Sequence, residues 1–452
     1  MASPTLAYEG VANCFPLITH KDPQAVVAYC NGSAITVERF LEDAARVAAT
    51  LSDGRYVLNT CQDRYRFAVG LAATLMTGRI SLMPPTLAPE TLNALRAIAP
   101  DYISLGDEDI LRVAPPEPHS VDRAVPQARP SVEGGLQAAW VFTSGSTGTP
   151  IPHAKTWGSI VRNVRVEARR LGMLDGRSHT IIGTVPPQHM YGFESTVLVA
   201  LQSGCAFDAS RPFYPADICK AIEAVPRPRL LVTTPFHLHS LLSSGMDVPK
   251  VDLVVSATAP LSQKLARETE ARLHADVLEI YGCTETGQIA TRRPTHTAEW
   301  QLFDGVQLNA QNGRVWASGG HLDEAVAMQD VLEITHDDCF LLHGRATDMI
   351  NIAGKRSSLA YLNHQLTAVP GVVDGTFFML DDTAVEKVTR LTAFVVAPGL
   401  SAAALTQALR ERIDPAFMPR PIIFVDALPR STTGKLPREA LVTLAKAHAQ
   451  RP

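Results

Sequence analysis

Short apolar runs alternate with amphipathic stretches along the first 350 residues or so. Apolar positions with helical spacing run from Phe40 to Leu51 behind Thr36, a suitable N-cap. Another helix is predicted at 67–76, with strands at 55–58 and 80–83 on either side, and a third helix at 156–171. Further strands are predicted at 138–142, 180–185, 230–234, 251–255 and 278–281. Strands that alternate with helices predict α/β sheets.

The last hundred residues have a different order of elements. Strands are predicted at 349–352, 375–380, 391–396 and 422–425, and helices at 359–369 and 401–413. This order is typical of a small α+β unit. Because single cores stop growing near 250 to 300 residues, a chain of 452 residues should contain more than one domain.

Composition narrows the class of protein. Hydrophobic residues make up 46% and charged residues 19%, as in ordinary globular proteins, and a net charge of −4 without a local basic block argues against nucleic-acid binding. The seven cysteines form no CxxC pair, which predicts reduced thiols in a cytoplasmic enzyme. No secretory signal pattern opens the chain, and the longest apolar run, 67–76, is far short of a bilayer span, so we expect no membrane anchor.

The most informative stretch follows the predicted strand at 138–142. It consists of small hydroxylated residues and glycines: Thr143, Ser144, Gly145, Ser146, Thr147 and Gly148. Backbone N–H groups and hydroxyls in such a loop can surround one anion, which favours a polyphosphate ligand. The loop lacks the Gly-Lys-Ser/Thr ending of a Walker A motif. Taken alone, a flexible Gly/Ser turn explains it as well.

Three later segments decide between these readings. They are Tyr281-Gly282-Cys283-Thr284-Glu285, then Gly344-Arg345-Ala346-Thr347-Asp348, and then Pro429-Arg430-Ser431-Thr432-Thr433-Gly434-Lys435. In this order, over roughly residues 60 to 440, the four segments resemble the adenylate-forming superfamily of acyl-CoA and aryl-CoA synthetases, peptide-synthetase adenylation domains and luciferases. The resemblance implies a large N-terminal domain of α/β sheets at 1–345, which binds ATP and acid. A small mobile α+β lid at 346–452 would carry the catalytic lysine.

The resemblance also implies site residues. Lys435, His189 and Glu285 are the predicted catalytic residues: Lys435 brings a positive charge to the reacting carboxylate and α-phosphate, His189 senses pocket occupancy, and Glu285 binds Mg²⁺. The predicted nucleotide- and cofactor-binding residues are Thr143, Ser144, Gly145, Ser146, Thr147, Gly148, Thr258, Ala259, Tyr281, Gly282, Thr284, Asp330, Arg345 and Arg356. For Arg356 and its neighbour Lys355, an exposed basic pair is the alternative to a phosphate contact.

The acid pocket is predicted to be formed by Gln188, His189, Tyr191, Gly192, Phe236 and Ser256. Its mixture of aromatic and polar groups suits a compact aromatic acid, and a medium-chain fatty acid is the alternative.

Among the departures from the family pattern, two concern the phosphate loop and the hinge. Ile151 stands where the family has a lysine after the proline, so Lys155 is either a substitute phosphate contact or a solvated residue beside the helix at 156–171. Thr347 stands at the hinge, where the family often has aspartate or lysine. Cys283 lies inside the second segment at a position that varies in the family, so we do not predict a catalytic cysteine.

The predicted function is that of an ATP-dependent carboxylic acid:thiol ligase. It would form an acyl- or aryl-adenylate, release pyrophosphate, and then pass the acyl group to CoA or to a phosphopantetheine carrier with release of AMP. The expected cofactors and partners are ATP, Mg²⁺, a small carboxylic acid and CoA, with an acyl carrier protein as the alternative acceptor and a homodimer as one option for assembly. The alternative function is a catalytically idle nucleotide-binding or regulatory relative, motivated by Ile151 and Thr347.

Overall fold

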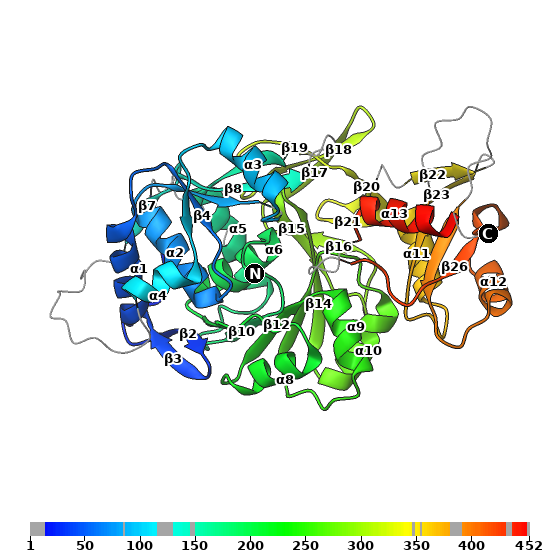
Figure 1. Ribbon diagram of the computed structural model, residues 1–452, viewed down its shortest axis with the longest axis horizontal. Coiled ribbons are helices and arrows are strands. Elements are labelled where there is room, and N and C mark those ends of the chain that lie inside the picture. Colours follow the sequence, from blue (N-terminus) through cyan, green and yellow to red (C-terminus); the bar gives the residue numbers. More distant parts are fainter. Residues whose placement is uncertain are drawn as a thin grey trace, which may run out of the picture.

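The computed structural model describes residues 14–84, 86–114, 130–144, 150–345, 349–352, 355–379, 391–430 and 436–449. A large body built on extended sheets occupies most of the chain, and a smaller group of elements from the C-terminal part lies beside it (Figure 1). Within the described ranges, no helix combines the length and the apolar character that a membrane span requires.

The larger sheet positions most of the predicted site residues. In spatial order its strands are β20 (Asp330–His336), β21 (Cys339–Arg345), β16 (Trp300–Leu302), β15 (Gly287–Arg292), β14 (Asp276–Cys283), β13 (Leu253–Ser256), β12 (Arg229–Thr233), β10 (Thr180–Gly183), β11 (Ala206–Asp208), β2 (Val26–Cys30) and β3 (Ser33–Thr36). From β14 to β2 neighbouring strands are parallel, and toward both edges they are antiparallel. The central strands are almost wholly buried, because parallel sheets are covered on both faces.

A second sheet carries the predicted phosphate loop. Its strands, in spatial order, are β6 (Ile103–Leu105), β4 (Tyr56–Asn59), β5 (Ile80–Met83), β8 (Gln137–Ser144) and β9 (Pro150–Thr156). All neighbours are parallel except β8 and β9, which pair in antiparallel fashion around the loop. Smaller ribbons pair β1 (Cys14–Pro16) with β7 (Ser131–Glu133), and β17 (Val306–Gln311) with β18 (Arg314–Gly319) and β19 (Val326–Ala327).

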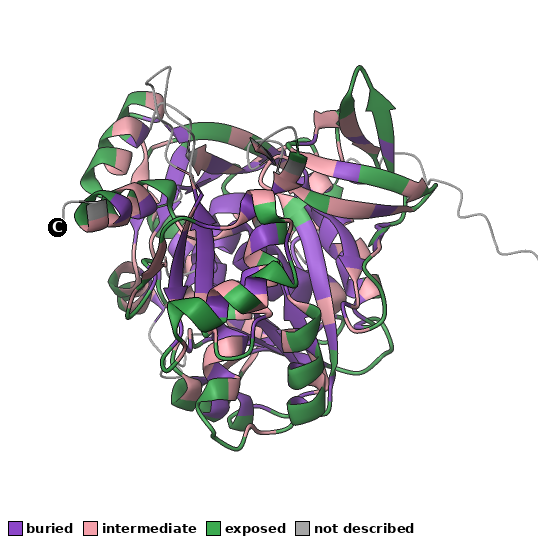
Figure 2. Ribbon diagram, turned by 90° about the vertical axis from the view of Figure 1, so that its right-hand side faces the viewer, coloured by how far each residue is buried: buried purple, intermediate pink, exposed green. Residues whose placement is uncertain are grey.

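Helices pack around these sheets, and buried residues concentrate between the layers (Figure 2). They are α1 (Val37–Thr50), α2 (Arg64–Met76), α3 (Pro89–Ile98), α4 (Asp107–Val113), α5 (Trp157–Arg170), α6 (Met190–Gly192), a π-helical turn η1 (Phe193–Leu198), α7 (Val199–Ser203), α8 (Pro215–Glu223), α9 (Pro235–Ser243) and α10 (Gln263–Leu273). The Thr36 hydroxyl accepts from the N–H of Arg39, so the predicted N-cap of α1 is confirmed.

One buried arginine joins helix α2 to strand ends of the larger sheet. Arg64 opens α2 and is fully buried, and its guanidinium donates to the carbonyl oxygens of Asp208 (2.9 Å), Gly183 (2.8 Å) and Val185 (3.0 Å). A guanidinium has five N–H donors in a rigid fork, so it can satisfy several strand-end carbonyls at once. Arg64 therefore fixes the chain that leaves β10, which leads to the predicted acid pocket.

The C-terminal elements have hydrophobic cores of their own. They comprise β22 (Met349–Ile352), β23 (Lys355–Ser358), α11 (Leu359–Thr367), β24 (Asp374–Phe378), β25 (Thr392–Val396), α12 (Ala402–Arg410), a 3₁₀ turn at Pro415–Phe417, β26 (Ile422–Phe424) and α13 (Arg438–Ala449). In the described part of the chain, the core clusters built from residues 350–445 share no member with those of the large body. The boundary between 345 and 346 stays a prediction, because residues 346–348 lie outside the described ranges.

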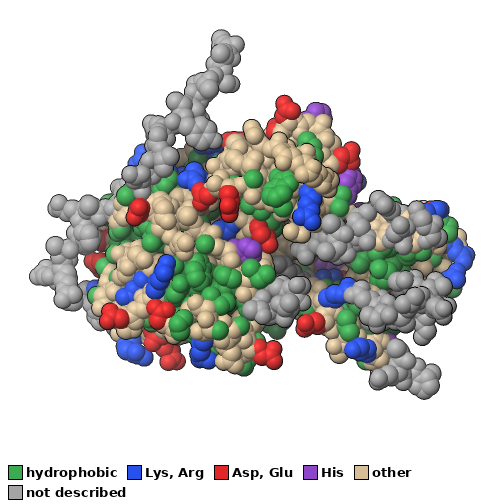
Figure 3. All heavy atoms as spheres, turned by 90° about the horizontal axis from the view of Figure 1, so that it is seen from above, with side chains coloured by type: hydrophobic (Ala, Val, Ile, Leu, Met, Phe, Trp, Pro, Cys, Tyr) green, Lys and Arg blue, Asp and Glu red, His purple; other side chains and the backbone are tan. Residues whose placement is uncertain are grey.

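The surface carries charges of both signs. On the face drawn in Figure 3, acidic and basic side chains are scattered over the large body. This mixture agrees with the small net charge of −4.

Candidate active site

The Tyr281–Glu285 segment forms the end of β14 and the loop that leads to β15. Gly287 follows this loop with φ of +70°, where L side chains are rarely found, and a Cβ there would lie 2.6 Å from Asn163 Nδ2. At Gly282 a Cβ would lie 2.2 Å from the carbonyl oxygen of Gly287. The two glycines allow a close hairpin, which presents Thr284 and Glu285 at its tip.

Several predicted nucleotide-binding residues meet at the ends of strands in the larger sheet. The Tyr281 hydroxyl lies 2.5 Å from Asp330 Oδ2, and in the sheet Asp330 is opposite Arg345. Thr258 follows β13, the strand beside β14, and has φ of +78°. The structure thus brings Tyr281, Asp330 and the backbone of Arg345 together, and places Thr258 and Ala259 after the adjacent strand.

The phosphate side of the site joins β8, β9 and the hairpin. Thr143, near the end of β8, has its Oγ1 2.9 Å from Nε2 of His153 on β9, and the same nitrogen is 3.9 Å from Oε1 of Glu285. Burial lowers the pKa of His153, although Glu285 opposes this shift. Sequence reasoning missed His153. Its position on a strand that returns directly from the phosphate loop is the signal that could have found it.

Lys155 lies in β9 and is only 9% exposed, so it is not a solvated residue beside the helix. Thr156 is the N-cap of α5, and Lys155 precedes it. The Lys155 ammonium donates to the carbonyl oxygen of Glu285 at 2.5 Å. Burial lowers the pKa of Lys155, and the nearby Glu194 opposes this shift. Lys155 therefore holds the hairpin in this structure, and its proposed role as a phosphate contact stays untested.

Buried polar side chains also lie next to the hairpin. His321 is 3% exposed, and its Nε2 lies 2.8 Å from the carbonyl oxygen of Thr286. Glu167 and Glu194 are buried as well, and burial raises the pKa of each carboxyl to about 8. The loop that carries Glu285 is thus contacted by side chains from β9 and from the segment before β19.

The predicted acid-pocket segment Gln188–Gly192 is fixed to both sheets. Gln188 Nε2 donates to the carbonyl oxygen of Cys61, and the Tyr191 hydroxyl donates to that of Val255 at 2.9 Å. His189 caps α6, with its Nδ1 3.3 Å from the backbone nitrogen of Tyr191. A Cβ at Gly192 would lie 2.1 Å from the carbonyl oxygen of Pro186, so only glycine fits there without a shift.

Ser256 and Phe236 complete the predicted acid pocket. Ser256 follows Val255, to which Tyr191 binds, and its hydroxyl is buried without a hydrogen-bond partner among the described residues. An unpaired buried hydroxyl is costly, and a hydrogen bond to a bound ligand would remove that cost. Phe236 is 37% exposed and its ring lies 6.2 Å from that of Phe213.

Glu285 is suited to a magnesium ion that also binds phosphate. Mg²⁺ in nucleotide sites is held by one or two carboxylates together with phosphate oxygens and water. The Glu285 side chain is 32% exposed, and within the described ranges no group of three or more His, Cys, Asp or Glu residues could hold a metal without a phosphate. A single accessible carboxylate therefore fits the ion.

Cys283 is not suited to nucleophilic catalysis. Its thiol lies 3.2 Å from the Thr286 hydroxyl, and burial raises the pKa of this thiol to about 11. Since the thiolate is the reactive form, little of it would be present at neutral pH.

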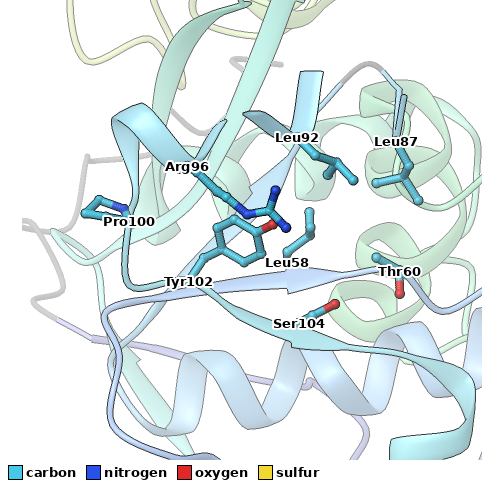
Figure 4. Close-up of a pocket in the computed structure, with 8 residues that line it drawn as sticks. All are labelled: Leu58, Thr60, Leu87, Leu92, Arg96, Pro100, Tyr102 and Ser104. Carbon is cyan, nitrogen blue, oxygen red and sulfur yellow. The ribbon is translucent and has the colours of Figure 1, made fainter. Parts of the chain in front are cut away.

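A separate hollow of about 390 Å³ lies over the ends of β4 and β6. Leu58, Leu92, Tyr102 and Arg96 form parts of its wall, and the side chain of Arg96 points toward Tyr102 (Figure 4). None of its lining residues belongs to the predicted site.

The sequence matches the family of AMP-binding enzymes over residues 18–308, and the C-terminal domain of AMP-binding enzymes over residues 365–435. The chain belongs to the AMP-binding enzyme family. The predicted resemblance and the prediction of an enzyme are thereby confirmed. Among the relatives of this AMP-binding enzyme, 4-coumarate–CoA ligase of Rhodobacter capsulatus is 30% identical over 74% of this chain and 84% of its own. The 4-chlorobenzoate–CoA ligase of an Arthrobacter species is 26% identical over 69% and 67%.

Solved structures share the fold of this AMP-binding enzyme. The anthranilate CoA ligase AuaEII in complex with anthranoyl-AMP superimposes with a TM-score of 0.79 over 95% of this chain and 96% of its own, at 16% identity. For o-succinylbenzoate coenzyme A synthetase of Bacillus subtilis, in complex with ATP and magnesium, the TM-score is 0.76 over 92% and 96%, at 16% identity. The predicted fold class is confirmed.

Some predicted site residues cannot be placed. Lys435, Gly145, Ser146, Thr147 and Gly148 lie outside the described residues, as does the hinge residue Thr347. Ser144, Arg345 and Arg356 are placed by their backbone alone, and Arg356 pairs with Asn351 across β22 and β23.

Proposed function

We propose that this AMP-binding enzyme is an ATP-dependent carboxylic acid:thiol ligase. In the first step a carboxylate oxygen attacks the α-phosphorus of ATP, the bond to the β-phosphate oxygen breaks, and an acyl- or aryl-adenylate forms with loss of pyrophosphate. In the second step the thiol sulfur attacks the acyl carbon and displaces AMP. The thiol proton passes to solvent, and a thioester is released.

The observation that carries this proposal is the meeting of Thr143, His153 and Glu285. Two of these residues flank the phosphate loop, and the third lies on the hairpin tip, yet one imidazole nitrogen is 2.9 Å from Thr143 Oγ1 and 3.9 Å from Glu285 Oε1. Tyr281 on β14, the strand that leads to the same hairpin tip, contacts Asp330 at 2.5 Å. Hydroxyl and carboxylate groups thus flank one place at the strand ends, as a polyphosphate with its metal ion requires.

In this proposal the protein supplies positioning and charge. Two anions must approach each other, so Lys435 on the lid at 346–452 would offset their repulsion as charge builds in the transition state. Asp330 would bind the ribose hydroxyls, and Arg345 would contact ribose or phosphate. Mg²⁺, when bound, neutralises phosphate oxygens, and Glu285 would hold it.

The acid is proposed to be a compact aromatic carboxylic acid. Relatives named for 4-coumarate and 4-chlorobenzoate support an aromatic ring. The exposed Phe236, the tethered Tyr191 and the unpaired Ser256 hydroxyl offer a ring contact and a polar contact within the predicted pocket. CoA is the proposed acceptor, in line with the same relatives.

Exchange of labelled pyrophosphate into ATP tests the first step. Exchange should depend on Mg²⁺ and on an aromatic acid such as a hydroxybenzoate or a cinnamate. If medium-chain fatty acids stimulate exchange more strongly than aromatic acids, the proposed substrate becomes a medium-chain fatty acid. If a thioester forms with a carrier protein but not with CoA, the proposed acceptor becomes the carrier protein. Tight ATP binding by a folded protein without exchange for any acid would refute the ligase proposal and favour an idle nucleotide-binding relative.

A further inference from the structure

Strand β9 contacts the hairpin tip through two side chains of one face. His153 and Lys155 are two residues apart, so in a strand their side chains project on the same side. Both contact Glu285, but at different groups. Lys155 binds its backbone carbonyl oxygen at 2.5 Å, and His153 lies 3.9 Å from its carboxylate.

The Lys155 contact fixes the backbone of the hairpin tip. Lys155 is 9% exposed, so its ammonium has little access to water, and the carbonyl of Glu285 is one of the few acceptors it can use. Glu194, which is 2% exposed, supplies negative charge from η1. Removal of the ammonium would leave the Glu285 carbonyl without this donor and the tip free to shift.

The His153 contact joins the carboxylate to the phosphate loop. Its Nε2 shares a hydrogen bond with the Thr143 hydroxyl at 2.9 Å, so the ring orientation is set from the β8 side. At 3.9 Å the approach to Glu285 Oε1 is a polar contact and not a hydrogen bond. The imidazole thus lies between the Thr143 hydroxyl and the Glu285 carboxylate.

We propose that His153 and Lys155 are positioning residues that hold Glu285 at two points and set its place relative to Thr143 before the reactants bind. The proposal rests on the proposed function, in which Glu285 holds Mg²⁺ and Thr143 contacts phosphate. A site arranged in advance avoids reorganisation during the reaction. Directly after Pro150, where the family has a lysine, this chain has Ile151, which is 50% exposed. In such a chain His153 and Lys155 would be the residues that position Glu285.

The first test compares Mg²⁺ dependence of pyrophosphate exchange in Lys155→Met, His153→Leu and His153→Gln. Met keeps most of the lysine volume without the donor, and Gln restores a polar group that Leu lacks. We expect Lys155→Met and His153→Leu to lower kcat about tenfold or more and to need several-fold more Mg²⁺ for half-maximal exchange. His153→Gln should recover most of the loss.

Exposed residues provide matched controls. Lys264 on α10 and His336 on β20 have side chains that are 57% and 72% exposed, so Lys264→Met and His336→Leu should leave the exchange unchanged. The proposal is wrong if Lys155→Met and His153→Leu keep the Mg²⁺ dependence and kcat of the wild type. It is also wrong for His153 if the Gln variant is no better than the Leu variant.

The second test does not require catalysis. Amide hydrogen exchange of residues 282–288, followed by mass spectrometry, should become faster in Lys155→Met, while exchange in β12 and β13 stays as in the wild type. Equal protection of the hairpin in both proteins would overturn the Lys155 contact even if no acid supports turnover. An inactive wild type with a loosened hairpin in the variant would instead refute only the proposed ligase function.

Discussion

The Tyr281 hydroxyl and Asp330 Oδ2 lie 2.5 Å apart, and they join the end of β14 to the first residue of β20. These strands are separated in the sheet by β15, β16 and β21. A side chain from the hairpin strand therefore orients a carboxylate that enters the site from the outer, antiparallel part of the sheet. In the proposed reaction this carboxylate binds ribose.

Replacing Tyr281 with phenylalanine should weaken ATP binding more than it slows chemistry. The substitution removes the hydroxyl that orients Asp330, and a hydrogen bond to a charged group contributes roughly 1.5 to 3 kcal/mol. We expect Tyr281→Phe to raise KM for ATP about tenfold with kcat nearly unchanged. Initial rates against ATP concentration measure this. Tyr214→Phe is the control, since Tyr214 is 67% exposed, and an unaltered KM in Tyr281→Phe would contradict the assigned role.

Replacing Gly192 with alanine should impair use of the acid. The new Cβ would lie 2.1 Å from the Pro186 carbonyl oxygen, so the segment that carries Gln188 and His189 must shift. Small displacements of a binding segment can cost up to about 10²-fold in rate, so kcat/KM for the acid should fall at least tenfold, with KM for ATP little changed.

Gly135→Ala is the matched control for this prediction. A Cβ at Gly135 would approach only Glu133 Oε1, at 4.0 Å, so the substitution should be tolerated. If Gly192→Ala retains wild-type kcat/KM for the acid, the segment does not line the acid pocket.

Replacing Lys435 with alanine should slow adenylation about 10²-fold or more, because a group that offsets charge in the transition state is lost. The melting temperature should stay unchanged. Lys446→Ala, on the exposed side of α13, is the control. Pyrophosphate exchange measures the effect, and a Lys435→Ala rate within a few-fold of wild type would remove Lys435 from the proposed mechanism.

The local sequence pattern was sufficient to predict many elements of the fold. The apolar run at 80–83 was predicted as a strand and is β5, and the prediction at 349–352 is β22. These runs are short, apolar and bounded by Pro84 or Gly354, so periodicity and chain breakers agree. The order of the four motifs was sufficient to predict the family, and the comparisons confirmed that prediction.

Contacts made by distant segments could not be predicted in this way. The sequence leaves Lys155 either as a substitute phosphate contact or as a solvated lysine beside a helix, because nothing near it in sequence signals burial. Its partners, Glu285 and Glu194, come from β14–β15 and η1. His153 could have been placed near Thr143 from the strand that returns after the phosphate loop, but its approach to Glu285 arises only when two sheets pack together. Such positions follow from tertiary packing and not from local pattern.

The buried carboxyl of Glu167 predicts a pH dependence of stability. Glu167 is fully buried on α5, neither carboxylate oxygen has a hydrogen-bond partner among the described residues, and burial raises its pKa from 4.5 to about 8. Between these two values the folded chain holds a proton that the unfolded chain has released. The stability contributed by the neutral carboxyl is therefore complete below pH 4.5 and is lost as pH rises through about 8.

Glutamine at this position cannot ionise, so Glu167→Gln should remove that loss. The difference in free energy of unfolding, variant minus wild type, should increase by about 1.4 kcal/mol per pH unit across this window. Above the window the difference should stay constant. Urea unfolding at intervals of one unit from about pH 5 to about pH 9 measures the difference. Glu268→Gln is the control, because the Glu268 side chain is 53% exposed on α10. A parallel pH profile for wild type and Glu167→Gln would mean that Glu167 is ionised in the folded chain at neutral pH.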